Sequence, residues 1–300
     1  MIKLFYSKDW TDYEILDTGE GEKLERFDKY VFVRPYEDAV WSKTLTAKEW
    51  NKADGKFWSS KQGAKTGWKM QEKIQDKWEM EYKGIKFLAH PTSFRHLGFF
   101  PEQASQWDFI EEKIKDSSKN NQRKIKFLNL FGYTGVASLF ALRAGGEVTH
   151  LDASKQTLAW AKENQKLNAE LAEAPMRIIE DDAIKFLERE EKRGNKYDAV
   201  IMDPPKYGRG PKGEIWKIEE MLPKLLSQAK KVLSDKPLFV IITSYAIDSS
   251  SLSLGYALKD MMKSFGGNVE SGELCVVEKS KGRIIPLANT ALWFSSGDAK

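Results

Sequence analysis

From residue 122 onward, apolar runs of strand length alternate with segments of helical periodicity. The strand-like runs cover residues 125–130, 147–151, 176–179, 197–202 and 238–243, and the helix-like segments cover 136–144, 155–168, 183–192, 214–233 and 252–265. Such alternation is typical of a parallel sheet covered by helices, because each crossover helix returns the chain to the same end of the sheet. The pattern therefore predicts a doubly wound α/β domain over residues 122–300.

The last part of that domain departs from the alternation. Two segments of period two, 273–279 and 286–294, are separated by Ser280-Lys281-Gly282-Arg283. A short polar connection with a glycine is a hairpin signal, so the final strand is predicted to be antiparallel.

The N-terminal part has a different pattern. Short strand-like segments at 29–34 and 78–88 flank a stretch rich in lysine, tryptophan and glycine. We predict a small, mostly β domain over residues 1–88, and a connector over 89–121 that ends in a helix.

Composition narrows the class of protein. Hydrophobic content of 41% with 31% charged residues is ordinary for a soluble globular protein, and no apolar run approaches the roughly 18 residues of a membrane span. The single cysteine excludes an intrachain disulfide, and no secretory signal begins the chain, so we expect a cytoplasmic location. The three histidines lack metal-site spacing, so no metal is expected. A net charge of +4 is compatible with an RNA partner without arguing for one.

The first predicted strand runs directly into Phe131-Gly132-Tyr133-Thr134-Gly135. Glycines at a strand-to-helix turn allow a sharp bend and the close approach of a ligand. The spacing lacks the third glycine of the dinucleotide-binding fingerprint, so a simple tight turn is the favoured interpretation of this motif alone.

Acidic residues follow the next two strands. Asp152 lies about 20 residues after Gly132, where a carboxylate is expected to accept ribose hydroxyls. Asp182 is placed to accept an adenine amine, and the small Ala183 leaves room for the ring. Helix capping is the alternative for both acids, and Ser154 fills the first cap equally well.

These motifs, read with Asn129 and the run Asp203-Pro204-Pro205-Lys206-Tyr207, stand in the order and spacing of class I S-adenosylmethionine-dependent methyltransferases. The Asp-Pro-Pro-Lys-aromatic form resembles most the bacterial 23S rRNA large-subunit methyltransferases, over about residues 85–300. The resemblance implies a seven-stranded sheet, and that fold is known for an antiparallel last strand. It also implies S-adenosylmethionine as cofactor, with Asp152 on the ribose, Asp182 near the adenine and residues 132–135 under the methionine part. The predicted cofactor residues are Asn129, Phe131, Gly132, Tyr133, Thr134, Gly135, Asp152, Ala153, Ser154, Asp182, Ala183, Asp203, Phe99 and Gln103.

The predicted catalytic residues follow the fourth strand: Asp203, Pro204, Pro205, Lys206 and Tyr207. The prolines restrict φ and hold the Asp203 carboxylate and the Pro204 carbonyl as acceptors for a nucleobase amine, and Tyr207 could stack on that base. The alternative is a proline pair that merely ends a buried strand.

The cytosine-5 members of the resembling family use a cysteine just after the fifth strand. Here that position reads Thr243-Ser244-Tyr245, and Cys275 lies on a later strand, where a packed thiol is expected. Methylation of a nitrogen is therefore favoured over cytosine C5.

Basic and aromatic residues outside these motifs are candidates for substrate binding. Arg95 lies in the connector, and Arg209 and Lys212 lie in a glycine-rich segment, 208–213, predicted to be a mobile loop that holds substrate phosphates. Between Trp41 and Lys86 there are eleven lysines interleaved with Trp41, Trp50, Trp58, Trp68 and Trp78. This stretch suits single-stranded RNA or the core of a small β domain, and the sequence does not separate the two.

The leading hypothesis is a methyltransferase acting on RNA, with rRNA the expected target. The alternatives are a methyltransferase for a protein side chain or small molecule, a nicotinamide-dependent oxidoreductase, and an RNA-binding module without catalysis. The acceptor base and the oligomeric state are not predicted.

Overall fold

The computed structural model describes residues 2–58, 66–121, 124–245 and 250–296. The chain divides into two compact units. The α/β unit comprises Met1–Phe5, Ser105–Leu274 and Leu287–Lys300, and the β unit comprises Tyr6–Ala104 and Cys275–Pro286.

These boundaries differ from the predicted ones at residues 88 and 121. The first residues belong to the α/β unit because Lys3–Phe5 pairs with a strand of its sheet. The segment Cys275–Pro286 belongs to the β unit, where the Lys279 N–H donates to the Ile15 carbonyl at 2.8 Å. Both assignments rest on pairings between residues more than 260 positions apart, which a pattern along the chain does not reveal.

The sheet of the α/β unit has eight strands in the order β1-β16-β17-β15-β12-β9-β10-β11. Their bounds are β1 Lys3–Phe5, β9 Lys126–Leu130, β10 Glu147–Asp152, β11 Met176–Glu180, β12 Ala199–Met202, β15 Phe239–Ser244, β16 Asn268–Val277 and β17 Ile284–Phe294. Strands β9 to β12 and β15 pair in parallel, and β17 pairs antiparallel with β15, which confirms the predicted antiparallel last strand. The predicted count of seven is one too low, since β1, only three residues long, adds an edge strand parallel to β16.

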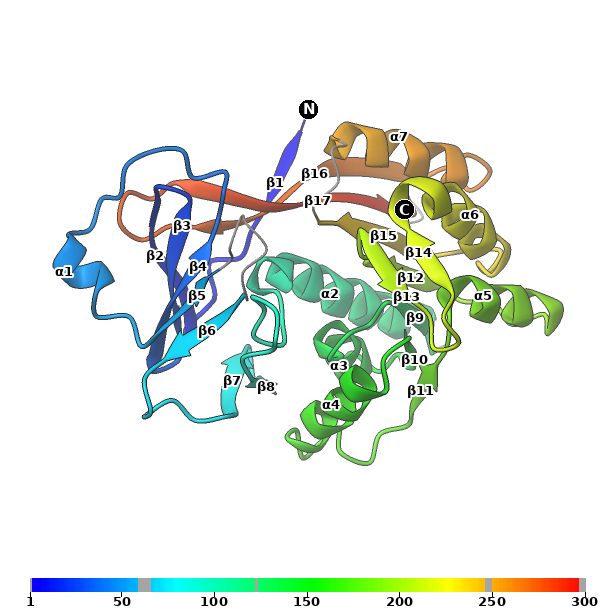
Figure 1. Ribbon diagram of the computed structural model, residues 1–300. Helices are drawn as coiled ribbons and strands as arrows, with labels where there is room; N and C mark the ends of the chain where they lie inside the picture. The colour runs from blue at the N-terminus through cyan, green and yellow to red at the C-terminus, as the bar shows by residue number, and fades with distance from the viewer. Residues whose placement is uncertain (1, 59–65, 122–123, 246–249, 297–300) are drawn as a thin grey trace. The chain divides into compact units, whose positions relative to one another are not determined.

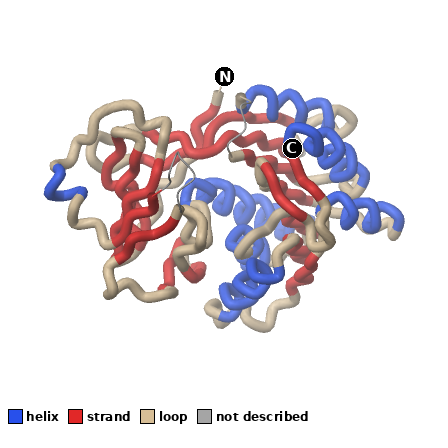
Figure 2. Tube along the Cα trace, in the orientation of Figure 1, coloured by secondary structure: helices blue, strands red, loops and turns tan. Residues whose placement is uncertain are grey.

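Helices cover both faces of this sheet (Figures 1 and 2). On one face lie α5 (Ala183–Lys192), α6 (Ile218–Lys231) and α7 (Ser251–Met262), whose apolar residues form one core with Leu128, Val200 and Val240. On the other lie α2 (Ala104–Asn121), α3 (Val136–Arg143) and α4 (Lys155–Lys166), where Trp107 stacks on Phe140. The doubly wound α/β prediction is confirmed.

One predicted helix begins later than expected. Residues 214–217 are not helical, because β13 (Tyr207–Arg209) and β14 (Ile215–Lys217) form an antiparallel hairpin ahead of α6. The segment 208–213, predicted as a mobile loop, is therefore partly a strand and a tight connection. Four of its six residues are small or proline, which hid the strand pairing in the sequence pattern.

The β unit contains a five-stranded sheet in the order β2-β3-β4-β5-β6 and a separate β7–β8 hairpin. The bounds are β2 Tyr13–Gly19, β3 Glu22–Phe27, β4 Tyr30–Pro35, β5 Gly55–Trp58, β6 Gly67–Met70, β7 Trp78–Tyr82 and β8 Ile85–Ala89, with the short helix α1 at Ala47–Trp50 and a 3₁₀ turn at Pro101–Gln103.

The tryptophans of the β unit mostly serve its core. Trp50 and Trp78 are buried, and Trp78 stacks on Phe32, while Trp68 packs edge-on against the same ring. Trp58 is the exception, with 41% of its surface exposed. Of the two interpretations of the Lys- and Trp-rich stretch, the structure favours the core.

Candidate active site

Most of the predicted site residues follow four adjacent strands, β12, β9, β10 and β11, at the same edge of the sheet. In the register of the sheet, Leu130 at the end of β9 lies opposite Leu151 on one side and Met202 on the other, and Asp152 lies opposite Glu180. The order of strands reverses at β9. Strands β10 and β11 lie on one side of β9, and β12 and β15 lie on the other. A crevice at the carboxyl ends of such strands is where ligands bind in doubly wound folds.

The loop after β9 takes a strained path. Phe131 and Tyr133 have φ values of 59° and 52°, and Gly135 has a φ of 86° where it caps α3. Left-handed backbone at non-glycine residues costs energy and is found preferentially at binding sites. Gly135 provides no side-chain cap to α3, which leaves the helix N-terminus suited to an anionic ligand group.

A buried network of hydrogen-bonded side chains lies beneath this loop. Asn129 donates to the Ser138 hydroxyl at 2.9 Å, and that hydroxyl is 3.0 Å from Nδ1 of His150. A Cβ atom at Gly132 would overlap the His150 ring, so glycine is required there for close packing. Burial lowers the pKa of His150 to about 4, and the imidazole is therefore neutral near pH 7. Asn129 was predicted to bind the cofactor, but its side-chain amide donates to Ser138 within this buried network.

Asp152 ends β10 and ties the loop to the next helix. Its carboxylate accepts the Tyr133 N–H at 2.9 Å, the Ser154 N–H at 2.9 Å and the Thr157 hydroxyl at 3.0 Å. A carboxylate has about four acceptor sites, so one remains for a ligand hydroxyl. Ser154, and not Asp152, is the N-cap of α4, so the capping alternative for Asp152 is not realised, and its contact with a ribose stays a prediction. Burial and the Asp152 charge raise the pKa of Tyr133 to about 12.

Asp182 is the N-cap of α5, where its Oδ1 accepts the Lys185 N–H at 3.0 Å. The neighbouring Asp181 is ion-paired with Arg189. Ala183 is buried in the core between α5 and the sheet. The capping interpretation of Asp182 is therefore realised, and its contact with an adenine amine stays a prediction that involves the second oxygen.

The run after β12 places an acid and two prolines at the carboxyl end of the sheet. Asp203 is half-buried, and its N–H reaches the Leu130 carbonyl at 3.4 Å, which joins this run to the end of β9. Pro204 is buried, whereas Pro205, Lys206 and Tyr207 are exposed.

Trp216, on β14, was not predicted and holds this run in place. Its indole Nε1 donates to the Pro205 carbonyl at 2.6 Å, and its ring packs edge-on against Phe131 with the centroids 5.0 Å apart. One buried side chain thus contacts both the run after β12 and the loop after β9. A single aromatic just after the glycine-rich segment 208–213 was the only sequence signal for it.

Three predicted residues lie in the β unit. Phe99 is buried among Trp10, Phe27 and Phe87, so its ring belongs to that unit's aromatic core. Arg95 is exposed and pairs with Glu37 at 3.5 Å. The cofactor contacts predicted for Phe99 and Gln103, and the substrate contact predicted for Arg95, stay predictions.

Cys275 lies on β16 and is 1% exposed, which confirms the packed thiol expected from the sequence. Within the described residues, no cluster of three His, Cys, Asp or Glu side chains could hold a metal ion. No helix in that part of the chain has the length and apolar character to cross a membrane.

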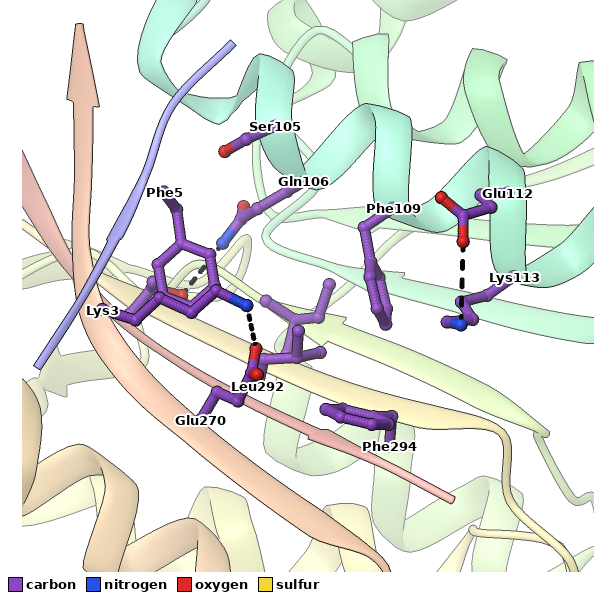
Figure 3. Close-up of a pocket in the computed structure, with 12 residues that line it drawn as sticks. Lys3, Phe5, Ser105, Gln106, Phe109, Glu112, Lys113, Glu270, Leu292 and Phe294 are labelled. Carbon is purple, nitrogen blue, oxygen red and sulfur yellow. Dashed lines mark hydrogen bonds and ion pairs between the residues drawn. The ribbon is translucent and has the colours of Figure 1, made fainter. Parts of the chain in front are cut away.

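A cavity of about 310 Å³ lies elsewhere in the α/β unit, between β1, α2 and the C-terminal strands (Figure 3). Phe5, Phe109 and Phe294 line it, with the Lys3–Glu270 ion pair at one side. Its described lining includes none of the predicted site residues. Gln106 bonds Thr243 and Thr290 at its floor, which fixes α2 to the sheet.

Comparisons with known proteins show what the whole chain is similar to. The family model described as conserved hypothetical protein 95 matches residues 106–248. The solved structure of a SAM-dependent methyltransferase from Agrobacterium tumefaciens is 39% identical, with a TM-score of 0.91 over 97% of this chain and 93% of that one.

Curated relatives match a smaller share. Ribosomal RNA large subunit methyltransferase K/L of Pseudoalteromonas translucida is 31% identical over 52% of this chain and 21% of its own length. Ribosomal RNA large subunit methyltransferase K of Neisseria meningitidis is 27% identical over 64% of this chain and 52% of its own. The chain thus spans between about a fifth and a half of the length of these relatives.

Proposed function

Because this chain belongs to the class I S-adenosylmethionine-dependent methyltransferases, we propose that it methylates a nucleobase of RNA, with rRNA as the target. The observation that carries the proposal is the adjacency of two elements. The run Asp203-Pro204-Pro205-Lys206-Tyr207 begins beside the end of β9, from which the glycine loop departs. Acceptors for a base amine therefore adjoin the loop expected to hold the cofactor.

The residues at the carboxyl ends of β9 and β10 fit S-adenosylmethionine. The left-handed backbone at Phe131 and Tyr133 is of the kind found at binding sites, the uncapped N-terminus of α3 suits a carboxylate, and Asp152 keeps acceptor capacity for ribose hydroxyls. When bound there, the cofactor supplies a methyl group activated by its sulfonium charge.

The chain's own residues would bind and orient the acceptor. The Asp203 carboxylate and the Pro204 carbonyl accept N–H groups of a base amine, which directs the nitrogen lone pair toward the methyl donor. Positioning of this kind can contribute roughly 7–11 kcal/mol, and it is the main contribution expected because no charge builds up in the transfer. Asp203 can also take the proton that the methylated amine loses.

The absence of a nucleophilic cysteine supports a nitrogen target. Cytosine C5 needs a covalent adduct to activate the carbon, and the chain's single cysteine, Cys275, is buried on β16. A ring or exocyclic nitrogen has its own lone pair and needs no nucleophile.

The test is methyl transfer from radiolabelled cofactor to total RNA and, in parallel, to total protein, both from a strain that lacks this protein. We expect label in rRNA and, after digestion, in an N-methylated nucleoside. Label confined to protein would contradict the RNA substrate, and label in 5-methylcytidine would contradict the nitrogen target. A Cys275→Ser variant, expected to retain turnover, checks the second point independently.

A further inference from the structure

Strands β13 and β14 form a hairpin (Figure 1). The side chains on its two faces differ in character. Its pairs are Tyr207 with Lys217, Gly208 with Trp216, and Arg209 with Ile215. Because side chains alternate along a strand and opposite residues share a face, Tyr207, Arg209, Ile215 and Lys217 lie on one face, and Trp216 lies on the other.

The inner face is fixed to the catalytic elements. Trp216 is 4% exposed and bonds the Pro205 carbonyl at 2.6 Å. The Ile218 N–H also donates to the Lys206 carbonyl at 3.0 Å, which joins the base of the hairpin to the same run. Whatever binds the outer face is therefore held at a fixed offset from Asp203.

The outer face is exposed although it carries large apolar groups. Tyr207 is 54% exposed and Ile215 is 57% exposed. Arg209 and Lys217 are exposed beside them, and Lys217 pairs only with a surface acid, Glu220, at 2.9 Å. Exposed pairs of this kind contribute little, so a phosphate can replace the carboxylate at small cost.

An aromatic ring, an aliphatic group and two cations on a narrow ribbon match the chemistry of single-stranded nucleic acid. Cations bind the backbone, and bases stack on the ring without sequence preference. A base in a duplex is stacked and paired, so it cannot reach Asp203 unless it is extruded.

We infer that the outer face of the β13–β14 hairpin, formed by Tyr207, Arg209, Ile215 and Lys217, binds a single-stranded RNA segment next to the methylated base. This inference rests on the proposed function and adds to it the form of the RNA and the residues Ile215 and Lys217.

The test uses fluorescence anisotropy of a labelled, mixed-sequence single-stranded RNA of about ten nucleotides, and of the same strand annealed to its complement, with protein saturated by S-adenosylhomocysteine. The variant is R209A/K217A. The matched control, K162A/K166A, removes two exposed cations one turn apart on α4.

We expect R209A/K217A to weaken single-strand binding about tenfold and to reduce the slope of log affinity against log salt by about one to two units. An I215A variant should weaken binding about threefold with an unchanged salt slope, because it removes only apolar contact. The control should change affinity less than twofold, and the duplex should bind more weakly than the single strand.

Equal losses in R209A/K217A and in the control, or tighter binding of the duplex, would overturn the inference. The proposed function fails separately, if the wild-type protein labels protein and not RNA. If RNA is labelled and R209A/K217A keeps the wild-type KM for it, only the hairpin assignment fails. Calorimetric binding of S-adenosylhomocysteine verifies that each variant is folded.

Discussion

Acidic residues lie at both ends of the parallel strands in the α/β unit, and the groups that donate hydrogen bonds to them differ between the two ends. At the carboxyl end, Asp152 and Asp203 are half-buried, and Asp152 accepts mainly backbone N–H groups of the loops around it. At the amino end, Glu190 is fully buried and lines a cavity of about 750 Å³ formed where β9, β10 and β11 begin.

The acceptor sites of the Glu190 carboxylate are occupied by hydrogen bonds from side chains. Arg177 donates to it at 2.9 Å, Tyr197 at 2.7 Å and Asn195 at 3.0 Å. Burial alone would raise the pKa of Glu190, but these bonds outweigh burial and hold the pKa at about 2. A carboxylate whose acceptor sites are all used stabilises the fold, whereas a carboxylate that orders a loop and keeps a site open can bind a ligand. Burial of an acid is thus a poor guide to function without its list of donors.

The largest effect that would test this contrast is expected at Asp203. Asp203→Asn keeps the size of the side chain and removes its charge and its capacity to take a proton, so kcat should fall by roughly 100-fold. The affinity for S-adenosylhomocysteine and the melting temperature should change little. A lower melting temperature with retained kcat would assign Asp203 to the structural class of Glu190.

The reverse result is expected for Glu190→Gln. It leaves Arg177 without a charged partner and should lower the free energy of unfolding at pH 7 by about 2 kcal/mol, with kcat unchanged. Glu191→Gln, at the next and exposed position, is the matched control and should cost less than about 0.5 kcal/mol.

The pH dependence of stability provides a second measurement on the same variant. Since the folded-state pKa of Glu190 lies below its ordinary value of 4.5, the contribution is complete above that value and is lost as pH falls toward 2. Urea denaturation at pH 7 and pH 3 should show a smaller difference in stability between these pH values for Glu190→Gln than for the wild type. An equal difference would show that Glu190 does not carry this contribution.

The sequence pattern predicted the parts of this molecule that depend on local order. The α5 bounds were predicted correctly because Asp182 caps a helix with a strongly amphipathic face, and the strand ends at Leu130 and Asp152 were predicted within one residue. Each of these elements is long enough for its period to be visible.

The parts that were missed are very short or depend on contacts between separate segments. β1 is three residues long and becomes a strand only through β16, and β13 and β14 are equally short. The supporting roles of His150 and Trp216 were not predicted, because each role comes from a contact. His150 packs against Gly132, and Trp216 donates to the Pro205 carbonyl. A period along the chain contains no information on such contacts.

The support beneath the glycine loop can be tested at Gly132. Gly132→Ala places a methyl group against the buried His150 ring and should weaken S-adenosylhomocysteine binding by about 10- to 30-fold, through displacement of the loop. Gly67→Ala is the matched control, since nothing lies within 4 Å of its Cβ position. Calorimetry measures both.

A double variant identifies the cause of that loss. If the clash with His150 is responsible, Gly132→Ala combined with His150→Ala should recover part of the affinity, a non-additivity expected only for residues in contact. Strict additivity of the two losses would show that the loop is displaced for another reason.

The smallest effect is expected at Trp216, and it separates the two loops at the carboxyl end from each other. Trp216→Phe keeps a ring against Phe131 and removes the N–H that bonds the Pro205 carbonyl, so it should affect the run after β12 more than the glycine loop. Loss of one hydrogen bond of about 1 kcal/mol corresponds to a roughly fivefold lower kcat, with the affinity for S-adenosylhomocysteine unchanged. Trp216→Ala removes both contacts and should lower kcat and cofactor affinity together, whereas Trp58→Phe, at an exposed indole, should lower neither. If Trp216→Phe instead weakened cofactor binding as much as it slowed turnover, the glycine loop and the run after β12 would be displaced together. The inference that they are supported separately would then be wrong.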